Sequence, residues 1–386
     1  MATQQVRWNK MFPVLLSFMV MGFVDIIGVA TGYIRQDFEL SNSTVQFLPM
    51  MVLLWFLILS VPAGIVQDKV GKRHMLNAGM VIQAIGLGLP FLHYSFGMMF
   101  ASFLLLGIGN TLIQVSANPL LQEVSPDEKL ASFLSTGQFL KAIVSFAGPL
   151  ITTFLAVRFG NWKLIFAIYG FSSMAVALWL ASTPITESKT DKKPASLSSC
   201  LGLLKTSFVT IMALAIFLLV GAEVAINTNI AIVLESKFGV TLEKAAIGIS
   251  LFFAGETIAR LAGAIMLNWI KPRRFLLLIS IVAIIGMTGI LLSPLYQVAL
   301  VSVFVTGLGA GSMFPVIFSL ALKKMPEYSN EISGLLIMAV SGGAFVPPLV
   351  GIVSDKISIN AAIITIGLCL TYILWVSFYL KKKAIP

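Results

Sequence analysis

The sequence predicts an all-α membrane protein in which twelve transmembrane helices form two pseudo-symmetric six-helix bundles. Three observations support this fold class: an apolar composition, a series of long apolar runs, and an internal repeat. Of the 386 residues, 58% are hydrophobic and only 11% are charged. A soluble globule of this size needs a larger polar surface, so we expect the lipid bilayer to be the main environment of the chain.

Long apolar runs follow one another along the whole sequence. A run of about 20 residues crosses the hydrocarbon core as a helix, and an even number of helices places both termini on one side. The twelve runs cover approximately residues 11–37, 44–67, 75–93, 97–122, 130–157, 162–182, 207–235, 244–269, 274–292, 297–322, 331–353 and 359–380.

The internal repeat divides the chain at its longest polar stretch. Its spacing is about 200 residues, so that Phe38 matches Phe238 and Gly109 matches Gly309. Parallel repeats of this kind place a site near the middle of the membrane between two halves that rock around it. The predicted domains are an N-terminal bundle over 1–183, a cytoplasmic linker over 184–206 and a C-terminal bundle over 207–386.

The distribution of cationic residues indicates how the chain is oriented in the membrane. Most of the 26 Lys and Arg residues fall in the loops on the side of the two termini, which predicts that both termini are cytoplasmic. The opposite loops carry only Arg35, Arg158, Lys163, Lys237, Lys244 and Lys356. The net charge of +10 is therefore explained by membrane topology, and nucleic acid is not an expected partner.

The sequence lacks the signatures of an enzyme. It has no GxxxxGK[ST] loop for a nucleotide, and its His and Cys residues do not have metal-ligand spacing. Cys200 and Cys369 lie too far apart for a redox pair. We therefore expect a chain that is not an enzyme, that binds no metal or cofactor, and that acts as a monomer.

Asp25 is the ionisable residue that most requires explanation, because it lies near the middle of the first apolar run. A charge at the centre of the bilayer costs on the order of 2–3 kcal/mol by insertion scales. Such residues mark ion, proton or substrate paths, so Asp25 is the predicted proton-coupling acid. Glu223 lies within two residues of the position that matches Asp25 in the second half. We expect both acids to face one cavity, with Glu223 as a second proton-coupling acid or as an acceptor for a substrate hydroxyl.

Three more charged residues fall inside helices. Lys141 is expected to pair with Asp25 or to bind an anionic group of the substrate, and a static ion pair is an equally good interpretation. Glu256 and Arg260 are spaced four residues apart, which lets them form a buried ion pair on one helical face.

Uncharged polar residues complete the predicted substrate site. Directional donors and acceptors together with an aromatic surface suit a small polar molecule such as a sugar. The substrate-binding candidates are Trp55, Gln114, Asn118, Gln138, Lys141, Glu223, Asn227 and Asn229.

The stretch GIVQDKVGKRHML resembles the signature loop of the major facilitator superfamily. Its characteristic residues, between the second and third runs, are Gly64, Asp68, Gly71, Lys72 and Arg73. This resemblance implies a conformational latch, in which charges near helix ends stabilise one of two bundle orientations.

A narrower resemblance comes from ANPLL, GAEVAINTNI and FPVIFSLALKKM followed by SGLLIMAVSGGAFVPPLVGIVSD. These stretches are similar to the fucose:proton symporter family, which includes bacterial glucose and galactose transporters. The resemblance implies monosaccharide import across the bacterial cytoplasmic membrane, with protons as the coupling ion and Asp25 as the coupling acid. The family's fucose-type members carry a glutamate where this chain has Gln114, which cannot carry a proton. Alternatives therefore remain: an acidic or amino sugar, sodium as the coupling ion, or export by proton antiport.

Overall fold

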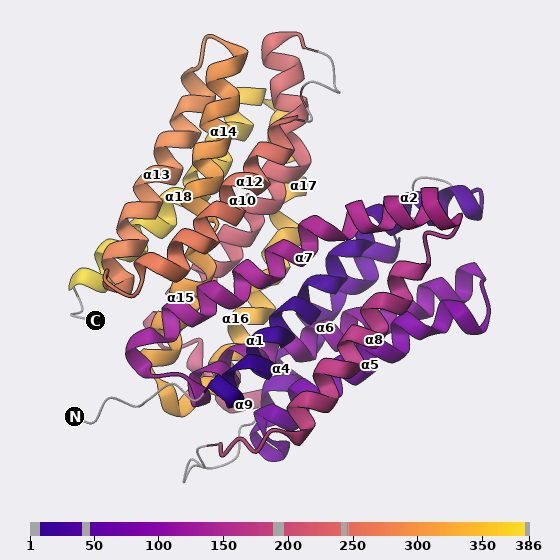
Figure 1. Cartoon of the computed structure of the whole chain (residues 1–386). Helices are drawn as coiled ribbons and strands as arrows, with labels where there is room; N and C mark the ends of the chain where they lie inside the picture. The colour runs from indigo at the N-terminus through magenta and orange to yellow at the C-terminus, as the bar shows by residue number, and fades with distance from the viewer. Residues whose placement is uncertain (1–7, 41–46, 188–196, 241–244, 246, 383–386) are drawn as a thin grey trace. The chain divides into compact units, whose positions relative to one another are not determined.

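The computed structural model describes residues 8–40, 47–187, 197–240, 245 and 247–382, and within these residues all regular structure is helical (Figure 1). In this part of the chain, twelve helical spans are long and apolar enough to cross a membrane. The predicted fold class is confirmed. The prediction works because each span must satisfy its own backbone hydrogen bonds in lipid, which limits the chain to helices.

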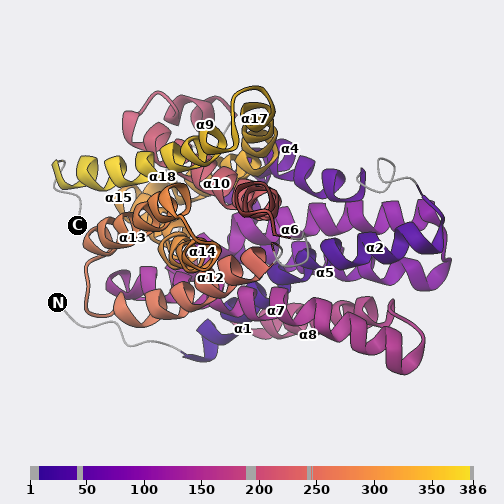
Figure 2. The ribbon, with the colours of Figure 1, turned by 90° about the horizontal axis from the view of Figure 1, so that it is seen from above.

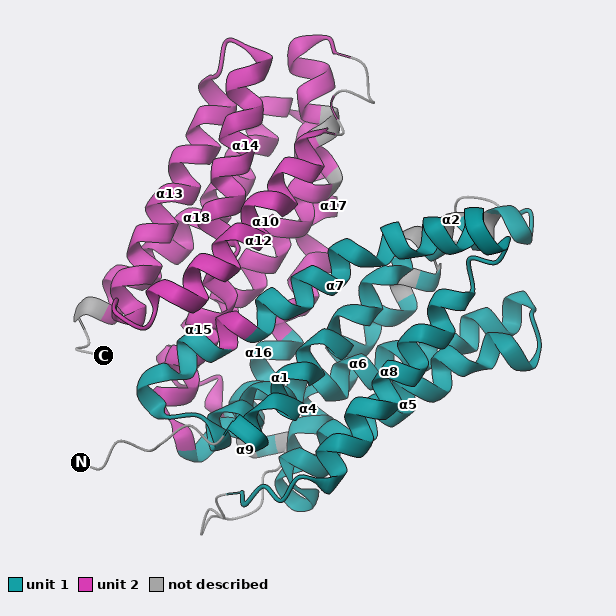
Figure 3. Cartoon of the chain, in the orientation of Figure 1, with its two compact units in different colours: residues 1–133, 137–202, 327–338 teal, residues 134–136, 203–326, 339–386 magenta. Residues whose placement is uncertain are grey.

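The chain divides into two compact units (Figure 3). Unit 1 contains residues 1–133, 137–202 and 327–338, and unit 2 contains residues 134–136, 203–326 and 339–386. The sequence-based domain boundaries at 183/184 and 206/207 stay a prediction.

In unit 1, α6 packs against α5, α4 and α1, and α8 packs against α5 and α1. Small residues allow these close contacts: a Cβ added to Gly79 on α5 would lie 2.8 Å from the carbonyl oxygen of Gly109 on α6. The helices of this unit are α1 (Trp8–Gly22), η1 (Phe23–Ile26), α2 (Ile27–Asp37), α4 (Phe47–Val70), α5 (Lys72–Leu92), α6 (Phe96–Val124), η2 (Asp127–Lys129), α7 (Leu130–Phe159), α8 (Leu164–Ser182), α9 (Leu197–Leu203) and α16 (Ser329–Met338).

In unit 2, α14 packs against α13 and α12, while α18 packs against α13 and α10 (Figures 1 and 2). The helices are α10 (Ser207–Phe238), α12 (Ile247–Met266), α13 (Pro272–Leu292), α14 (Tyr296–Ala310), α15 (Met313–Lys324), η4 (Ala339–Ser341), α17 (Gly342–Lys356) and α18 (Ile359–Lys382). A short turn, η3 (Pro326–Tyr328), leads into α16.

Each unit contains a membrane span that is interrupted. In unit 1 the first span changes from α-helix to the 3-10 turn η1 after Gly22, and then continues as α2. In unit 2 the span from Tyr296 to Lys324 is interrupted between α14 and α15. Interruptions of this kind often mark functional positions, because they free backbone groups and re-aim side chains.

Candidate substrate and coupling site

The 3-10 turn η1 carries Asp25. Its neighbours Phe23, Val24 and Ile26 are buried, whereas Asp25 is exposed. The hydroxyl of Ser145 on α7 donates a hydrogen bond to Asp25 Oδ2, and the same hydroxyl lies 3.0 Å from the carbonyl oxygen of Lys141. The turn therefore presents the carboxylate to α7 and leaves part of it accessible.

Helix α7 approaches α1 closely enough to fix this arrangement. A Cβ added to Gly22 would lie 2.8 Å from the carbonyl oxygen of Lys141, and a Cβ added to Gly137 would lie 2.7 Å from the ring of Phe18. Neither position has space for a larger residue. The two glycines thus set the distance at which Asp25 meets Ser145.

A ladder of amides runs along α6 to the interrupted helix. Asn118 Nδ2 donates to the carbonyl of Gln114 at 3.0 Å, and Gln114 Nε2 donates to Asn110 Oδ1 at 2.8 Å. Asn110 Nδ2 in turn donates to the carbonyl of Met21 at 2.7 Å. All three amide side chains are buried. The structure therefore connects the substrate candidates Gln114 and Asn118 to the end of α1, directly before the turn that carries Asp25.

The other candidates in unit 1 lie on two helices. Trp55 on α4 packs against α6, since a Cβ added to Gly107 would lie 2.9 Å from its ring. Gln138 and Lys141 lie on α7, and all three side chains are half-buried. No ion pair within 4.0 Å joins Lys141 to an acid of the described residues, so the pairing of Lys141 with Asp25 stays a prediction.

The candidates in unit 2 lie on α10. Glu223, Asn227 and Asn229 are half-buried, and Asn229 Nδ2 donates to the carbonyl of Ala225 at 2.9 Å. This bond within the helix uses one of the donors proposed for substrate. The expectation that Glu223 and Asp25 share a cavity stays a prediction.

Glu256 and Arg260 lie on α12, beside the second interrupted span. Arg260 Nη2 is 3.2 Å from Glu256 Oε2, and Arg260 Nε donates to the carbonyl of Gly311 at 3.3 Å. Ser312 donates from its hydroxyl to the carbonyl of Ala259 at 2.6 Å. The pair thus contacts the backbone at the end of α14, which the four-residue spacing alone did not indicate.

The signature loop begins α5 with Gly71 at a φ of +91°, a conformation that favours glycine. The carboxylate of Glu187 accepts hydrogen bonds from the backbone N–H groups of Lys72 at 2.7 Å and of Arg73 at 3.0 Å. A carboxylate at this position satisfies two unpaired donors and complements the positive end of the helix dipole. Glu187 therefore caps α5 from the segment that follows α8.

Three charged side chains of the loop have a defined partner. Lys72 forms an ion pair with Glu123 on α6, Arg73 Nη2 donates to the carbonyl of Ala181 at 2.9 Å, and Asp68 Oδ1 accepts from Asn330 Nδ2 at 2.9 Å. Asp68 thus meets the first turn of α16 through a neutral amide.

Sequence reasoning missed several of these partners. They lie far away in sequence and carry no local motif, although a buried amide or acid in an apolar run is itself a usable signal. The missed residues are Asn110, Glu123, Ser145, Glu187 and Asn330.

A polar cluster ties together loop ends in unit 1. Asp37 Oδ2 accepts hydrogen bonds from the Tyr94 hydroxyl and from Trp162 Nε1 at 2.9 Å, and Lys163 Nζ lies 3.6 Å from the centre of the Tyr94 ring. Burial raises the pKa of the Tyr94 hydroxyl, and the hydrogen bond to Asp37 and the charge of Asp37 raise it further. An open cavity of about 440 Å³ adjoins the cluster. Because these polar groups form hydrogen bonds and a cation–π contact with one another, the cluster is better explained as a structural contact between loop ends than as a ligand site.

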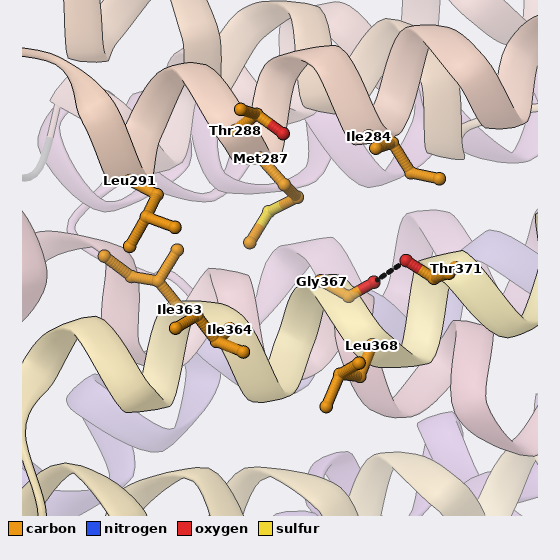
Figure 4. A pocket seen from close by; sticks show the side chains of 9 residues that line it. All are labelled: Ile284, Met287, Thr288, Leu291, Ile363, Ile364, Gly367, Leu368 and Thr371. Carbon is orange, nitrogen blue, oxygen red and sulfur yellow. Dashed lines mark hydrogen bonds between the residues drawn. The ribbon is translucent and has the colours of Figure 1, made fainter.

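A second cavity, of about 180 Å³, lies between α13 and α18 in unit 2 (Figure 4). Its lining is apolar except for two threonines, and Thr371 donates its hydroxyl to the carbonyl of Gly367 at 2.8 Å. Such a lining offers too few polar groups for a sugar. Several residues of these two helices, such as Ile285 and Leu368, expose apolar surface, which suits contact with lipid.

Comparison with known proteins supports the resemblance found in the sequence. The family model of the Major Facilitator Superfamily matches residues 14–348. The chain is 26% identical over 383 residues to a glucose/galactose transporter of Brucella abortus, covering 93% of this chain and 90% of that protein. It is 22% identical over 360 residues to the L-fucose-proton symporter of Escherichia coli, with coverages of 83% and 81%. A crystal structure of the transporter FucP in its outward conformation matches with a TM-score of 0.83 at 19% identity, over 96% of this chain and 99% of that chain.

Proposed function

Because the chain belongs to the major facilitator superfamily, we propose that it imports a monosaccharide across the bacterial cytoplasmic membrane by proton symport and alternating access. Two observations support the substrate class and the coupling ion. The chain is similar along most of its length to a glucose/galactose transporter. In addition, the first membrane span is interrupted by a 3-10 turn that carries the accessible Asp25.

The carboxylate of Asp25 is the proposed proton carrier. In its charged form it accepts the hydrogen bond from Ser145; after protonation it becomes neutral and can itself donate. A change of this kind alters the contact between η1 and α7. In the proposed cycle, proton binding therefore biases the equilibrium between the outward-open and inward-open states.

The proposed sugar contacts come from amide and aromatic side chains. Gln138 and Lys141 lie one turn apart on α7, and Trp55 on α4 offers an apolar ring surface. Gln114 and Asn118 are nearly enclosed and bonded along α6, so their proposed role is to orient the site. Glu223 and Asn227 on α10 of unit 2 stay candidate sugar contacts from the sequence alone.

The experiment uses the purified full-length chain in sealed vesicles with a pH-sensitive dye inside. A proton gradient directed inward, with the outside more acidic, should drive accumulation of glucose, galactose or fucose. Addition of the sugar alone should acidify the lumen. Protein-free vesicles are the control. Sugar uptake that follows a sodium gradient instead would contradict proton coupling, and outward movement of substrate against inward proton flow would indicate antiport.

A second candidate is an acidic or amino sugar, and Lys141 supports the acidic one. This cation lies half-buried on a membrane helix, and Gln114 stands where fucose-type relatives carry an acid. Lys141→Gln should reduce uptake of an anionic sugar such as glucuronate by about tenfold or more, because a charge-assisted hydrogen bond contributes roughly 1.5–3 kcal/mol. Equal losses for glucuronate and glucose would contradict a role in binding the anion.

A further inference from the structure

The interruption of the first span leaves backbone carbonyls at the end of α1 short of regular helical partners, because the hydrogen-bond pattern changes from α to 3-10 after Gly22. An unsatisfied carbonyl in an apolar interior is costly. Two side chains from neighbouring helices supply donors. Gln83 Nε2 on α5 lies 2.8 Å from the carbonyl oxygen of Val20, and Asn110 Nδ2 on α6 lies 2.7 Å from that of Met21.

Both amides are fully enclosed, with relative exposures of 0%. A buried amide is costly unless it is hydrogen-bonded, so these residues need a partner as much as the carbonyls do. Gln83 and Asn110 both lie beside the junction at which α1 ends and η1 begins. Their presence at this junction therefore points to a specific task.

The internal repeat provides a control within the same chain. The equivalent of the first span in unit 2 is α10, which runs without interruption from Ser207 to Phe238. The repeat spacing places Ala283 and Ala310 at the positions of Gln83 and Asn110. One contact verifies this register: Gly109 approaches the backbone of Gln83, and Gly309 approaches that of Ala283. The amides are thus present beside the interrupted helix and replaced by alanine beside the continuous one.

At the second interruption the roles of the two units are exchanged: the interrupted span is in unit 2, and its continuous equivalent is in unit 1. In unit 2 Arg260 on α12 donates to the carbonyl of Gly311 at the end of α14. The repeat places Ser60 on α4 at this position, because Gly107 approaches Val52 as Gly307 approaches Phe252. Among the residues that the structure describes, Ser60 donates to the carbonyl of Phe56 in its own helix, at 2.5 Å. The α6 that it faces is continuous. Polar side chains therefore accompany these two interruptions and not their repeat equivalents.

We propose that Gln83 and Asn110 are positioning residues for proton coupling: together they hold the 3-10 turn of the first span so that Asp25 meets Ser145. This inference rests on the proposed function and deepens it. Asn110 also accepts the hydrogen bond from Gln114, which places the same amide between the substrate candidates on α6 and the turn. A change at Gln114 on sugar binding is thereby passed to the backbone that carries the acid.

The test compares Asn110→Leu and Gln83→Leu with Asn77→Leu in full-length protein in lipid nanodiscs. Asn77 is a half-buried amide on α5 that takes no part in the junction, so its replacement controls for the loss of an amide. Hydrogen exchange of a peptide covering residues 20–27 should become roughly tenfold faster in the two junction variants, the factor that corresponds to one lost hydrogen bond. The control variant should keep the wild-type rate.

Transport is the second readout. In Asn110→Leu and Gln83→Leu, accumulation driven by a pH gradient should fall about tenfold and lose its dependence on the gradient, while sugar exchange at equal pH is reduced much less. A general packing defect would lower both activities together. Two variants are used so that poor folding of one leaves the other to decide.

Unchanged hydrogen exchange at residues 20–27 would overturn the proposal, and so would faster exchange with intact gradient-driven accumulation. If the wild type moves no sugar with protons, the proposed function fails, and the positioning role in coupling fails with it. That failure is recognised in the wild type, whereas failure of the positioning role alone is recognised in the variants.

Discussion

Asp25 combines two properties that are rare in a membrane span, because it is ionisable and its surface is accessible. Retaining a carboxylate there costs on the order of 2–3 kcal/mol by insertion scales. The cost is partly offset by the Ser145 hydroxyl, which bonds the carboxylate. Ser145 lies 120 positions from Asp25 in the sequence, and no sequence pattern around Asp25 predicts this contact.

Replacing Asp25 by Asn keeps the size of the side chain and removes its ability to exchange a proton. We expect Asp25→Asn to abolish accumulation of sugar against a gradient and to leave equilibrium exchange partly intact, because the binding site persists while coupling is lost. Uptake and exchange are measured side by side in vesicles, with Asp127→Asn, in the turn η2, as the control. Concentrative uptake at the wild-type level in Asp25→Asn would exclude Asp25 as the coupling acid.

Tyr94 gives a pH-dependent prediction outside the membrane spans. Its pKa is raised by burial, by the hydrogen bond to Asp37 and by the charge of Asp37. The folded state therefore retains the phenolic proton when the unfolded chain has lost it. This contribution to stability is fully present below the ordinary tyrosine pKa of about 10 and is lost as the pH rises above it.

The thermal midpoint of the wild type should consequently fall between pH 9 and pH 11, and Tyr94→Phe should fall less over the same range. Differential scanning fluorimetry in detergent measures both midpoints, with Tyr379→Phe as the matched control. Parallel pH curves for the wild type and Tyr94→Phe would show that the Tyr94–Asp37 bond does not contribute.

At the scale of elements, the connection from α4 to α5 depends on one backbone conformation. Gly71 has a φ of +91°, and a Cβ there would lie 3.1 Å from the Glu187 carboxylate. A side chain at this position is strained by its backbone and also displaces the group that caps α5.

Gly71→Ala should therefore destabilise the protein by roughly 1–3 kcal/mol and lower the thermal midpoint. Gly88→Ala is the matched control, because Gly88 also lies on α5 and a Cβ there meets nothing within 4 Å. In the helix interior that change should be neutral or slightly stabilising. A similar midpoint for the two variants would contradict the argument from strain and capping.

At the scale of the whole molecule, the two halves share a repeat but place their interruptions in different helices. The first span is interrupted in unit 1, and the span Tyr296–Lys324 is interrupted in unit 2. These two interruptions have polar partners from adjacent helices in their own units. The two repeats therefore differ in structure at these two spans.

The distribution of cations predicts the orientation of the whole chain. A fluorescent protein fused after residue 386 should fold and fluoresce in the bacterial cytoplasm, because both termini are expected there. An alkaline phosphatase fusion at the same position should be inactive, and a fusion in the loop after α5 serves as the opposite control. Active phosphatase at the C-terminus would reverse the predicted topology.

Much of the fold follows from the sequence. The twelve spans were predictable because length and hydropathy decide which segments cross a bilayer, and the repeat was visible in matched residues such as Gly109 and Gly309. The site was predictable only in part. Asp25 and Gln114 stood out as polar residues in apolar runs, but their partners Ser145 and Asn110 were not recognised.

The sequence by itself determined the membrane environment, the number of spans, the duplication and the isolated acid at Asp25, because these depend on composition and on local periodicity. Only the tertiary structure decided that the first span is interrupted at Gly22, that Gln83 and Asn110 bond its carbonyls, and that Glu187 caps α5. These features depend on contacts between residues that lie roughly 60 to 115 positions apart. Local sequence patterns do not predict such contacts, because the contacts form only when neighbouring helices pack side by side.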